Sequence, residues 1–370
     1  MRKCYNWLFV AGAGVLVVVG ILIFHYAILP IIVHKQVAET LQLNNGTDAW
    51  DRFVNLPVPL YFRVYIFNLI NPDAVARGEK AIVKEVGPYV YKETREKFNL
   101  QLFDDNDTVR YEERTKFEFD AKLSHPLTED DYIQPTNPTA PIVYSIVERL
   151  PEVSFLSELL DPGFKAMFGD RYGLTLNVTV RQLLFDGVEA KCPPNGTIVN
   201  RLVCSAIHNF PLVKVGRRLP NGDLSIAILR FKNETSGGVF EIYRGNHDFE
   251  KIGMITSING APTVDNWPGE RCNLVSGTYA ESLIKPFLTM DSKFSFYDDD
   301  ACTASPMSGD SEETVEGIDC LKFTPASSFL SPVTDHPENY CYCPGSIGGL
   351  TQGTACLKKG VMDISPCQGT

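Results

Sequence analysis

Histidine is scarce in this sequence, and the residue patterns of common catalytic sites are missing. Only six of the 370 residues are histidine, and two of these, His25 and His34, lie in or beside an apolar N-terminal segment. The other four are dispersed, without the paired spacing of a zinc site. There is no phosphate-binding loop, dinucleotide-binding fingerprint or nucleophile elbow. We therefore expect a protein that is not an enzyme and that has no cofactor and no metal site.

Basic residues are outnumbered by acidic ones, 34 to 45, which gives a formal net charge of −11. Such a chain repels phosphate, so nucleic acid is excluded as a partner. The run from Asp104 to Asp107 hints at calcium, but it lacks the glycine and the terminal glutamate of an EF-hand loop. The run from Asp298 to Asp300 is typical of a solvated acidic turn.

Long apolar runs are absent except at the N-terminus, where 18 residues from Trp7 to Phe24 carry no charge. As a helix this run spans roughly 27 Å, close to the hydrocarbon thickness of a bilayer. The alternative is a cleaved signal peptide, but the small residues at 11–13 come too early for a cleavage site. We predict a cytoplasmic tail at 1–6, a transmembrane helix at 7–33, and an extracellular domain at 34–370 of a plasma-membrane protein. Cys4, at the cytoplasmic edge, is a candidate for palmitoylation.

Cysteine is almost absent from the first half of the chain, because nine of the ten cysteines lie beyond residue 190. The C-terminal cysteines could bind zinc, but an oxidising compartment favours disulfides, and spacing alone does not assign their pairing. Five glycosylation sequons support the same compartment; they begin at Asn45, Asn106, Asn177, Asn195 and Asn233.

Alternating hydrophobicity predicts a β-rich body. The clearest signal runs from Val109 to Asp120, with one apolar and one charged face. Further strands are predicted at Tyr61–Leu69, Leu224–Phe231, Val239–Tyr243, Phe294–Tyr297 and Ile318–Phe323. Helical spacing instead dominates residues 140–185, where the helix-compatible run is interrupted at Pro151 and Pro162, and a short helix is predicted at Val180–Phe185.

Several ordered motifs resemble the class B scavenger receptor family. They are Val64–Glu93, Phe119-Asp120, Thr128–Asp131, Leu184–Gly187, Trp267 with Cys272-Asn273, Gly277-Thr278, Asn339–Cys343 and Gly360–Cys367. Within the family, Phe185–Cys192 followed by Cys204, Ile242–Gly245 and Cys356–Asp363 are most similar to insect sensory neuron membrane proteins. Family members continue further and end in a second transmembrane helix, so the chain is expected to be truncated at its C-terminus.

The resemblance implies an α+β fold: an antiparallel β-barrel-like ectodomain with an apical helical bundle near 140–185 and an internal hydrophobic tunnel, incomplete here. It also implies three disulfides, Cys272–Cys341, Cys302–Cys367 and Cys343–Cys356, within a disulfide-rich part at 272–367. Cys192 and Cys204, twelve residues apart, are a further candidate pair, which would leave Cys320 as an odd thiol.

The implied function is a membrane receptor that binds and transfers lipid-derived ligands. In the sensory form these ligands are fatty-acid-derived pheromones, and the partners are membrane lipids, an odorant receptor channel and a soluble odorant-binding carrier. The alternative is general uptake of fatty acids, or surface recognition of lipoprotein particles or apoptotic cells. Candidate residues at the ligand entrance are Phe155, Leu159, Phe164, Lys165, Met167 and Phe168, for each of which plain packing within the bundle is the competing explanation.

Overall fold

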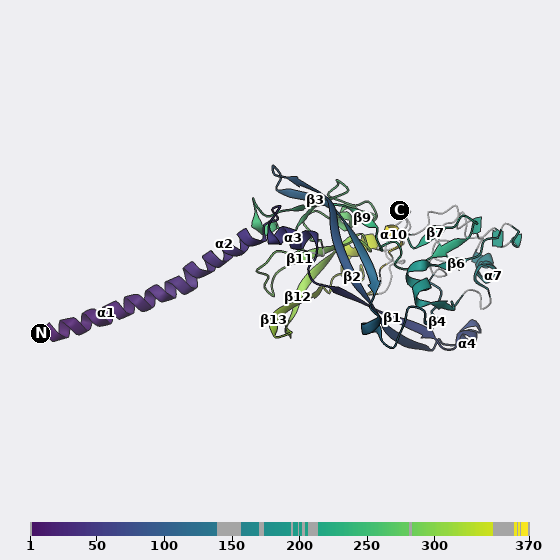
Figure 1. Cartoon of the computed structure of the whole chain (residues 1–370), viewed down its shortest axis with the longest axis horizontal. Helices are drawn as coiled ribbons and strands as arrows, with labels where there is room; N and C mark the ends of the chain where they lie inside the picture. Colours follow the sequence, from purple (N-terminus) through teal and green to yellow (C-terminus); the bar gives the residue numbers. More distant parts are fainter. Residues whose placement is uncertain are drawn as a thin grey trace.

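The N-terminal segment forms one continuous helix that leaves the rest of the molecule at one end (Figure 1). The computed structural model describes residues 2–138, 157–169, 174–193, 195–198, 200–201, 204–205, 214–280, 283–342, 359–360, 362 and 364–368. The helix comprises α1 (Arg2–Ile23), a π-helical turn (Phe24–Ile28) and α2 (Leu29–Leu41). Its part at Ala11–Leu41 contains an 18-residue window with a mean hydropathy of 2.7, none of which is buried, so this part is long and apolar enough to cross a membrane.

The π-helical turn has a local cause in the sequence. Pro30 lacks an N–H group, and its ring would clash with the carbonyl group four residues earlier. The backbone widens before it, so that the N–H group of Leu29 donates to the carbonyl oxygen of Phe24, five residues back. The helix therefore continues through the proline instead of breaking there.

A five-stranded antiparallel sheet forms the centre of the body. Its order is β1 (Leu60–Leu69), β2 (Val83–Phe103), β3 (Thr108–Phe119), β9 (Ser236–Tyr243) and β10 (Ile255–Ile258). Burial alternates along β3 as the sequence predicted, with Val109 and Tyr111 buried and Arg114 and Lys116 exposed. The predicted strands corresponding to β1, β3 and β9 are confirmed.

A second antiparallel sheet faces the first across a hydrophobic core. It contains β11 (Phe294–Asp298), β12 (Thr303–Val315) and β13 (Ile318–Pro325), which confirms the two strands predicted there. The core also takes in α3 (Asp48–Val54), whose first turn is capped by Thr47, since its Oγ1 accepts the N–H of Trp50 at 3.2 Å. We call these elements, together with β3, β9, β10 and the part of β2 that pairs with β3, the proximal part. Its buried core residues are Leu43, Trp50, Phe53, Val109, Tyr111, Ile242, Ile255, Ile258, Val275 and Tyr297.

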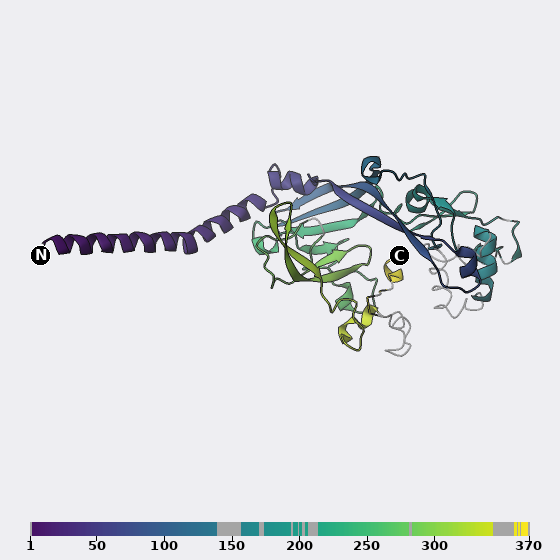
Figure 2. The ribbon, with the colours of Figure 1, turned by 90° about the horizontal axis from the view of Figure 1, so that it is seen from below.

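The distal part lies at the end opposite the N-terminal helix, and β1 and β2 run towards it (Figures 1 and 2). It contains α4 (Pro72–Ala76), α5 (Ala121–Ser124), β4 (Tyr132–Ile133), α7 (Ser157–Phe168), β5 (Val178–Thr179), a π-helical turn (Gln182–Asp186), β6 (Val188–Ala190), β7 (Gly216–Arg218) and β8 (Leu224–Ile226). Its two sheets have the orders β4-β5 and β6-β8-β7. Together with the proximal part this is an α+β fold, as expected.

Two details of the distal part correct the sequence predictions. The strand predicted at Leu224–Phe231 ends at Ile226, and the chain then turns. The helical run is not broken at Pro162, which lies inside α7. Pro162 is exposed there, so one lost backbone hydrogen bond is offset by the burial of Leu160 and Phe164 on the opposite side. The predicted helical residues at 139–156 lie outside the described part.

Short helical turns and three disulfides complete the described chain. The turns are Phe249–Lys251, α9 (Glu270–Asn273), Pro337–Tyr342 and α10 (Ser365–Gln368). The disulfides join Cys192 to Cys204, Cys272 to Cys341 and Cys302 to Cys367. Cys320 is a free thiol on β13, whereas the expected pair Cys343–Cys356 lies outside the described residues.

Candidate functional site

A cavity of about 200 Å³ lies in the proximal part, lined from both sheets. Ligand pockets are commonly ~300–1,000 Å³, so this space suits a segment of a lipid chain and not a large solute. The lining residues come from β2, β3, β9, β11 and the segments between them: Arg95, Tyr111, Glu113, Thr115, Lys214, Phe231, Lys232, Thr235, Ser236, Gly237, Phe240, Ala280, Tyr297 and Asp299.

Aromatic rings form one side of the cavity. Tyr111 of β3 and Phe240 of β9 are directly paired across the sheet, and their rings stack with centroids 5.8 Å apart. The ring of Tyr297 meets Phe240 edge-on at 6.4 Å. Burial raises the pKa of both tyrosine hydroxyl groups above their ordinary value, so they stay neutral at physiological pH. This side can therefore pack against an apolar chain.

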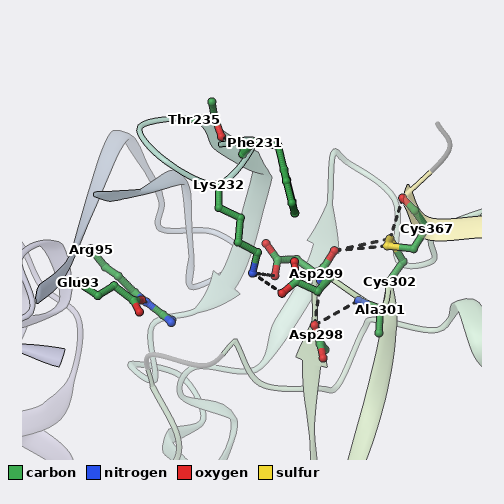
Figure 3. Close-up of polar contacts among 11 residues, drawn as sticks. Glu93, Arg95, Phe231, Lys232, Thr235, Asp298, Asp299, Ala301, Cys302 and Cys367 are labelled. Carbon is green, nitrogen blue, oxygen red and sulfur yellow. Dashed lines mark hydrogen bonds and ion pairs between the residues drawn. A yellow bond between two sulfur atoms is a disulfide. The ribbon is translucent and has the colours of Figure 1, made fainter. Parts of the chain in front are cut away.

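Charged side chains form the other side of the cavity. The ammonium group of Lys232 forms ion pairs with Asp300 and, at 3.8 Å, with Asp299 (Figure 3). Arg95 lies apart from Lys232 and Asp299 in the same view, and its Nε donates to Oε1 of Glu93 at 2.6 Å. The cavity thus brings cationic and anionic groups next to an aromatic wall, which is an amphipathic environment.

A buried ion pair closes the cavity towards the hydrophobic core. Nζ of Lys97 lies 2.6 Å from Oε2 of Glu113, and the side chain of Lys97 is only 3% exposed. The same ammonium group lies over the ring of Phe53, 4.7 Å from its centroid. Burial lowers the pKa of Lys97, and Glu113 opposes that shift by favouring the charged form.

Carboxylates of both acidic runs are paired with cationic side chains or accept hydrogen bonds from N–H groups of the protein. Lys232 offsets part of the negative charge of the turn that begins at Asp298, whose Oδ1 accepts the N–H of Asp300 at 2.8 Å. In the other run, Asp104 pairs with Arg244 at 2.6 Å, and Asp107 accepts hydrogen bonds from Asn246 and His247. Arg244 also donates to the carbonyl oxygen of Leu43, so this second run ties the end of α2 to the body. These contacts give both runs a structural role.

Five of the predicted entrance residues, Leu159, Phe164, Lys165, Met167 and Phe168, lie on α7, in the distal part, away from the cavity. Phe164 and Met167 are fully or almost fully buried, Phe168 is half-buried, and Lys165 is exposed. Phe164 and Phe168 stack at 5.9 Å, and Met167 packs beside the disulfide of Cys192. The arrangement matches the packing explanation for Phe164 and Met167. Phe155 and the side chain of Leu159 lie outside what the structure describes.

The remaining predicted sites fall at the surface or at the chain end. The asparagines of four sequons are exposed, namely Asn45, Asn106, Asn177 and Asn195. Asn233 is half-buried, and its Oδ1 accepts the N–H of Phe117 at 3.0 Å. Cys4 belongs to α1, although its side chain is outside the described residues.

Sequence reasoning missed most of the cavity. Arg95 lies on β2, which was not predicted as a strand, and Lys232 follows no local pattern. Asp299 was interpreted only as part of a solvated acidic turn. One signal was present: Glu113 is a charged residue on the otherwise apolar face of β3. A buried charge of this kind requires a partner and often marks a functional site.

Comparison with known proteins gives a consistent result. The model of the CD36 family matches residues 11–370. Sensory neuron membrane protein 2 of Manduca sexta is 30% identical over 374 residues, which cover 100% of this chain and 70% of that protein. The protein of the same name from Anopheles gambiae is 28% identical, covering 96% of this chain and 70% of its own length. Scavenger receptor class B member 1 of Rattus norvegicus is 29% identical, covering 92% of this chain and 60% of that receptor.

Proposed function

Because this chain belongs to the CD36 family, we propose that it is a membrane-anchored receptor that binds lipid-derived ligands and passes them towards the bilayer. The N-terminal helix would hold residues 34–370 at the outer surface of the plasma membrane. The protein would act without a covalent step and without a cofactor, and so not as an enzyme.

The observation that carries this proposal is the amphipathic cavity of the proximal part. An apolar chain would pack against Tyr111, Phe240 and Tyr297, with its polar end towards Lys232 and Arg95. Each buried methylene contributes about 0.8 kcal/mol, so a chain of twelve or more carbons has ample driving force to leave water. Because the cavity lies in the part nearest the N-terminal helix, ligand bound there would be close to the membrane (Figure 2).

The finer proposal is a sensory role. Similarity to sensory neuron membrane protein 2 supports fatty-acid-derived pheromones as ligands. A soluble odorant-binding carrier would deliver the ligand, and an odorant receptor channel would receive it. General lipid uptake is the alternative, which similarity to scavenger receptor class B member 1 supports.

Displacement of a fluorescent fatty chain from the full chain, in phospholipid nanodiscs, tests the proposal. Unlabelled fatty acids, acetates and aldehydes of increasing length are titrated, and we expect displacement to strengthen with chain length. Preference for acetates or aldehydes would support the sensory role. A folded, glycosylated sample that binds none of these probes would overturn lipid transfer and favour recognition of particles or cells.

A matched pair of variants locates the binding. Phe240→Trp adds volume inside the cavity and is expected to weaken displacement about tenfold, a change of about 1.4 kcal/mol. Tyr243→Trp, three residues along the same strand and therefore on the opposite face, should leave displacement unchanged. Equal effects of both substitutions would place the ligand elsewhere.

A further inference from the structure

The first residue beyond the predicted membrane span makes specific contacts with the body. The ring of His34 stacks on the ring of Phe287 with centroids 4.8 Å apart, and it meets Phe249 edge-on at 6.1 Å. Nε2 of His34 also lies 3.8 Å from a carboxylate oxygen of Glu250. Phe249 and Phe287 come from two separate loops of the proximal part. Both aromatic rings therefore lie at the depth of residue 34, where the span ends.

Phe287 combines an exposed aromatic side chain with a strained backbone conformation. Its side chain is 50% exposed, and its backbone φ is +60°, in the left-handed region that large residues rarely adopt. Strained residues cluster at functional sites, where the surrounding structure maintains them. Burial in the core does not explain this conformation, because half of the ring faces outward.

The charges around these rings balance one another. Lys35 pairs with Glu39, Lys251 with Asp248, and Lys285 with Glu250. The surface therefore has no net charge that would select an anionic or a cationic protein. Long lysine side chains can place their ammonium groups among lipid headgroups while their methylene stems lie along apolar surface. The aromatic rings of Phe249 and Phe287, surrounded by paired charges that sum to zero, suit the interface of a zwitterionic bilayer.

We propose that Phe287, supported by Phe249 and His34, inserts into the outer membrane interface and holds the proximal part against the bilayer. This inference rests on the proposed function, because it requires α1 and α2 to anchor the chain in a membrane. The contact gives the body a second attachment point beside the helix. It restricts tilting of the body and keeps the cavity of the proximal part close to the lipid surface.

Fluorescence quenching in the full chain tests the contact. A Trp7→Phe, Phe287→Trp double variant is reconstituted in phosphatidylcholine vesicles whose acyl chains carry bromine near the headgroup. Tryptophan partitions to this interface, so the introduced indole should lose about half of its emission. The matched control, Trp7→Phe with Tyr132→Trp, places an indole at a highly exposed position of the distal part. Its emission should not change between brominated and ordinary lipids, and the buried Trp50 and Trp267 are common to both variants.

The two hypotheses fail separately in this experiment. In the parent protein, quenching of Trp7 by the same lipids, brominated near the headgroup, reports insertion of the helix itself, because Trp7 is the first residue of the predicted span and would lie at the membrane interface. If Trp7 is quenched but the indole at position 287 emits equally in both lipids, the interfacial contact is wrong and the anchored receptor stands. If Trp7 is not quenched, the membrane anchoring in the proposed function fails.

Discussion

The proximal and distal parts of the body are stabilised in different ways. In the proximal part, β2 and β3 pair over most of their lengths, and the second sheet encloses one continuous core. In the distal part the strands contain only two or three residues, so they form few backbone hydrogen bonds. A disulfide between Cys192 and Cys204 adds a covalent link there. Long paired strands can accommodate a buried ion pair such as Lys97–Glu113, because the backbone hydrogen bonds between the strands fix the positions of both side chains. Short strands depend on tightly packed apolar residues and a covalent link.

This contrast assigns different tasks to the two parts. A rigid sheet can maintain an amphipathic cavity whose polar groups must keep their partners. A region held by short elements can open locally at lower free energy, as binding loops and lids do. Admission of ligand near α7 would then require local movement, since Phe164 and Met167 are buried.

The largest effect is expected from Phe164→Asp. Placing an unpaired carboxylate at a fully buried site combines the loss of a packed ring with the burial of a charge, at a cost of about 5 kcal/mol. Hydrogen exchange should show loss of protection throughout the distal part, with the proximal strands still protected. Lys165→Glu, at the adjacent exposed position, should change stability by less than ~1 kcal/mol. Normal protection in Phe164→Asp would show that the packing of α7 is not required.

A similar loss in the proximal part is expected from Glu113→Gln. The ammonium group of Lys97 would lose its carboxylate partner while remaining buried, at a cost of roughly 3–5 kcal/mol. Chemical denaturation followed by exchange in β2 and β3 measures the change. The double variant Lys97→Met, Glu113→Leu removes both charges and should recover most of the stability. If the double variant is as unstable as the single one, the ion pair is not the cause.

Removal of the Cys192–Cys204 disulfide should affect only the distal part. A closed loop of this size contributes about 3 kcal/mol in the chain-entropy model. In Cys192→Ser, Cys204→Ser, amides of β6 and β8 should exchange faster, while those of β3 and β9 are unchanged. Faster exchange in both parts would contradict the separation of the two.

The smallest effect is expected from Lys232→Gln. This half-buried ion pair contributes less than about 1 kcal/mol to stability, so the variant should fold normally. Its effect should appear in ligand preference, because the cavity would lose a cation that can meet a carboxylate. We expect roughly threefold weaker displacement by fatty acids and no change for acetates of equal length. Equal weakening for both ligand classes would indicate a packing role for Lys232.

The sequence predicted strands that are rich in apolar and aromatic residues or that alternate in polarity. β3 alternates between apolar and polar residues, and β1 is an apolar-aromatic run. Both are present, and so are the predicted strands β9, β11 and β13. β2 was missed because Glu93, Arg95 and Lys97 place charges on its inward face and remove the alternation. β12 was missed because small and polar residues dominate it.

The cavity could not be predicted from local patterns. Lys232 and Asp299 are 67 positions apart in the sequence and meet only through the packing of two loops. The family resemblance directed attention to the helical segment instead. There the apolar residues Phe164 and Met167 signalled burial, which hydrophobic spacing alone does not distinguish from a ligand entrance.

Photo-crosslinking with a fatty chain that carries a diazirine at its apolar end tests the central claim most directly. The probe is bound to the full chain in nanodiscs, irradiated, and the labelled peptides are identified by mass spectrometry. We predict labels on the peptides that contain Tyr111, Phe240 or Tyr297, which an excess of unlabelled fatty chain removes and Phe240→Trp reduces. Specific labels confined to α7, with none on β3, β9 or β11, would contradict a lipid site in the proximal part.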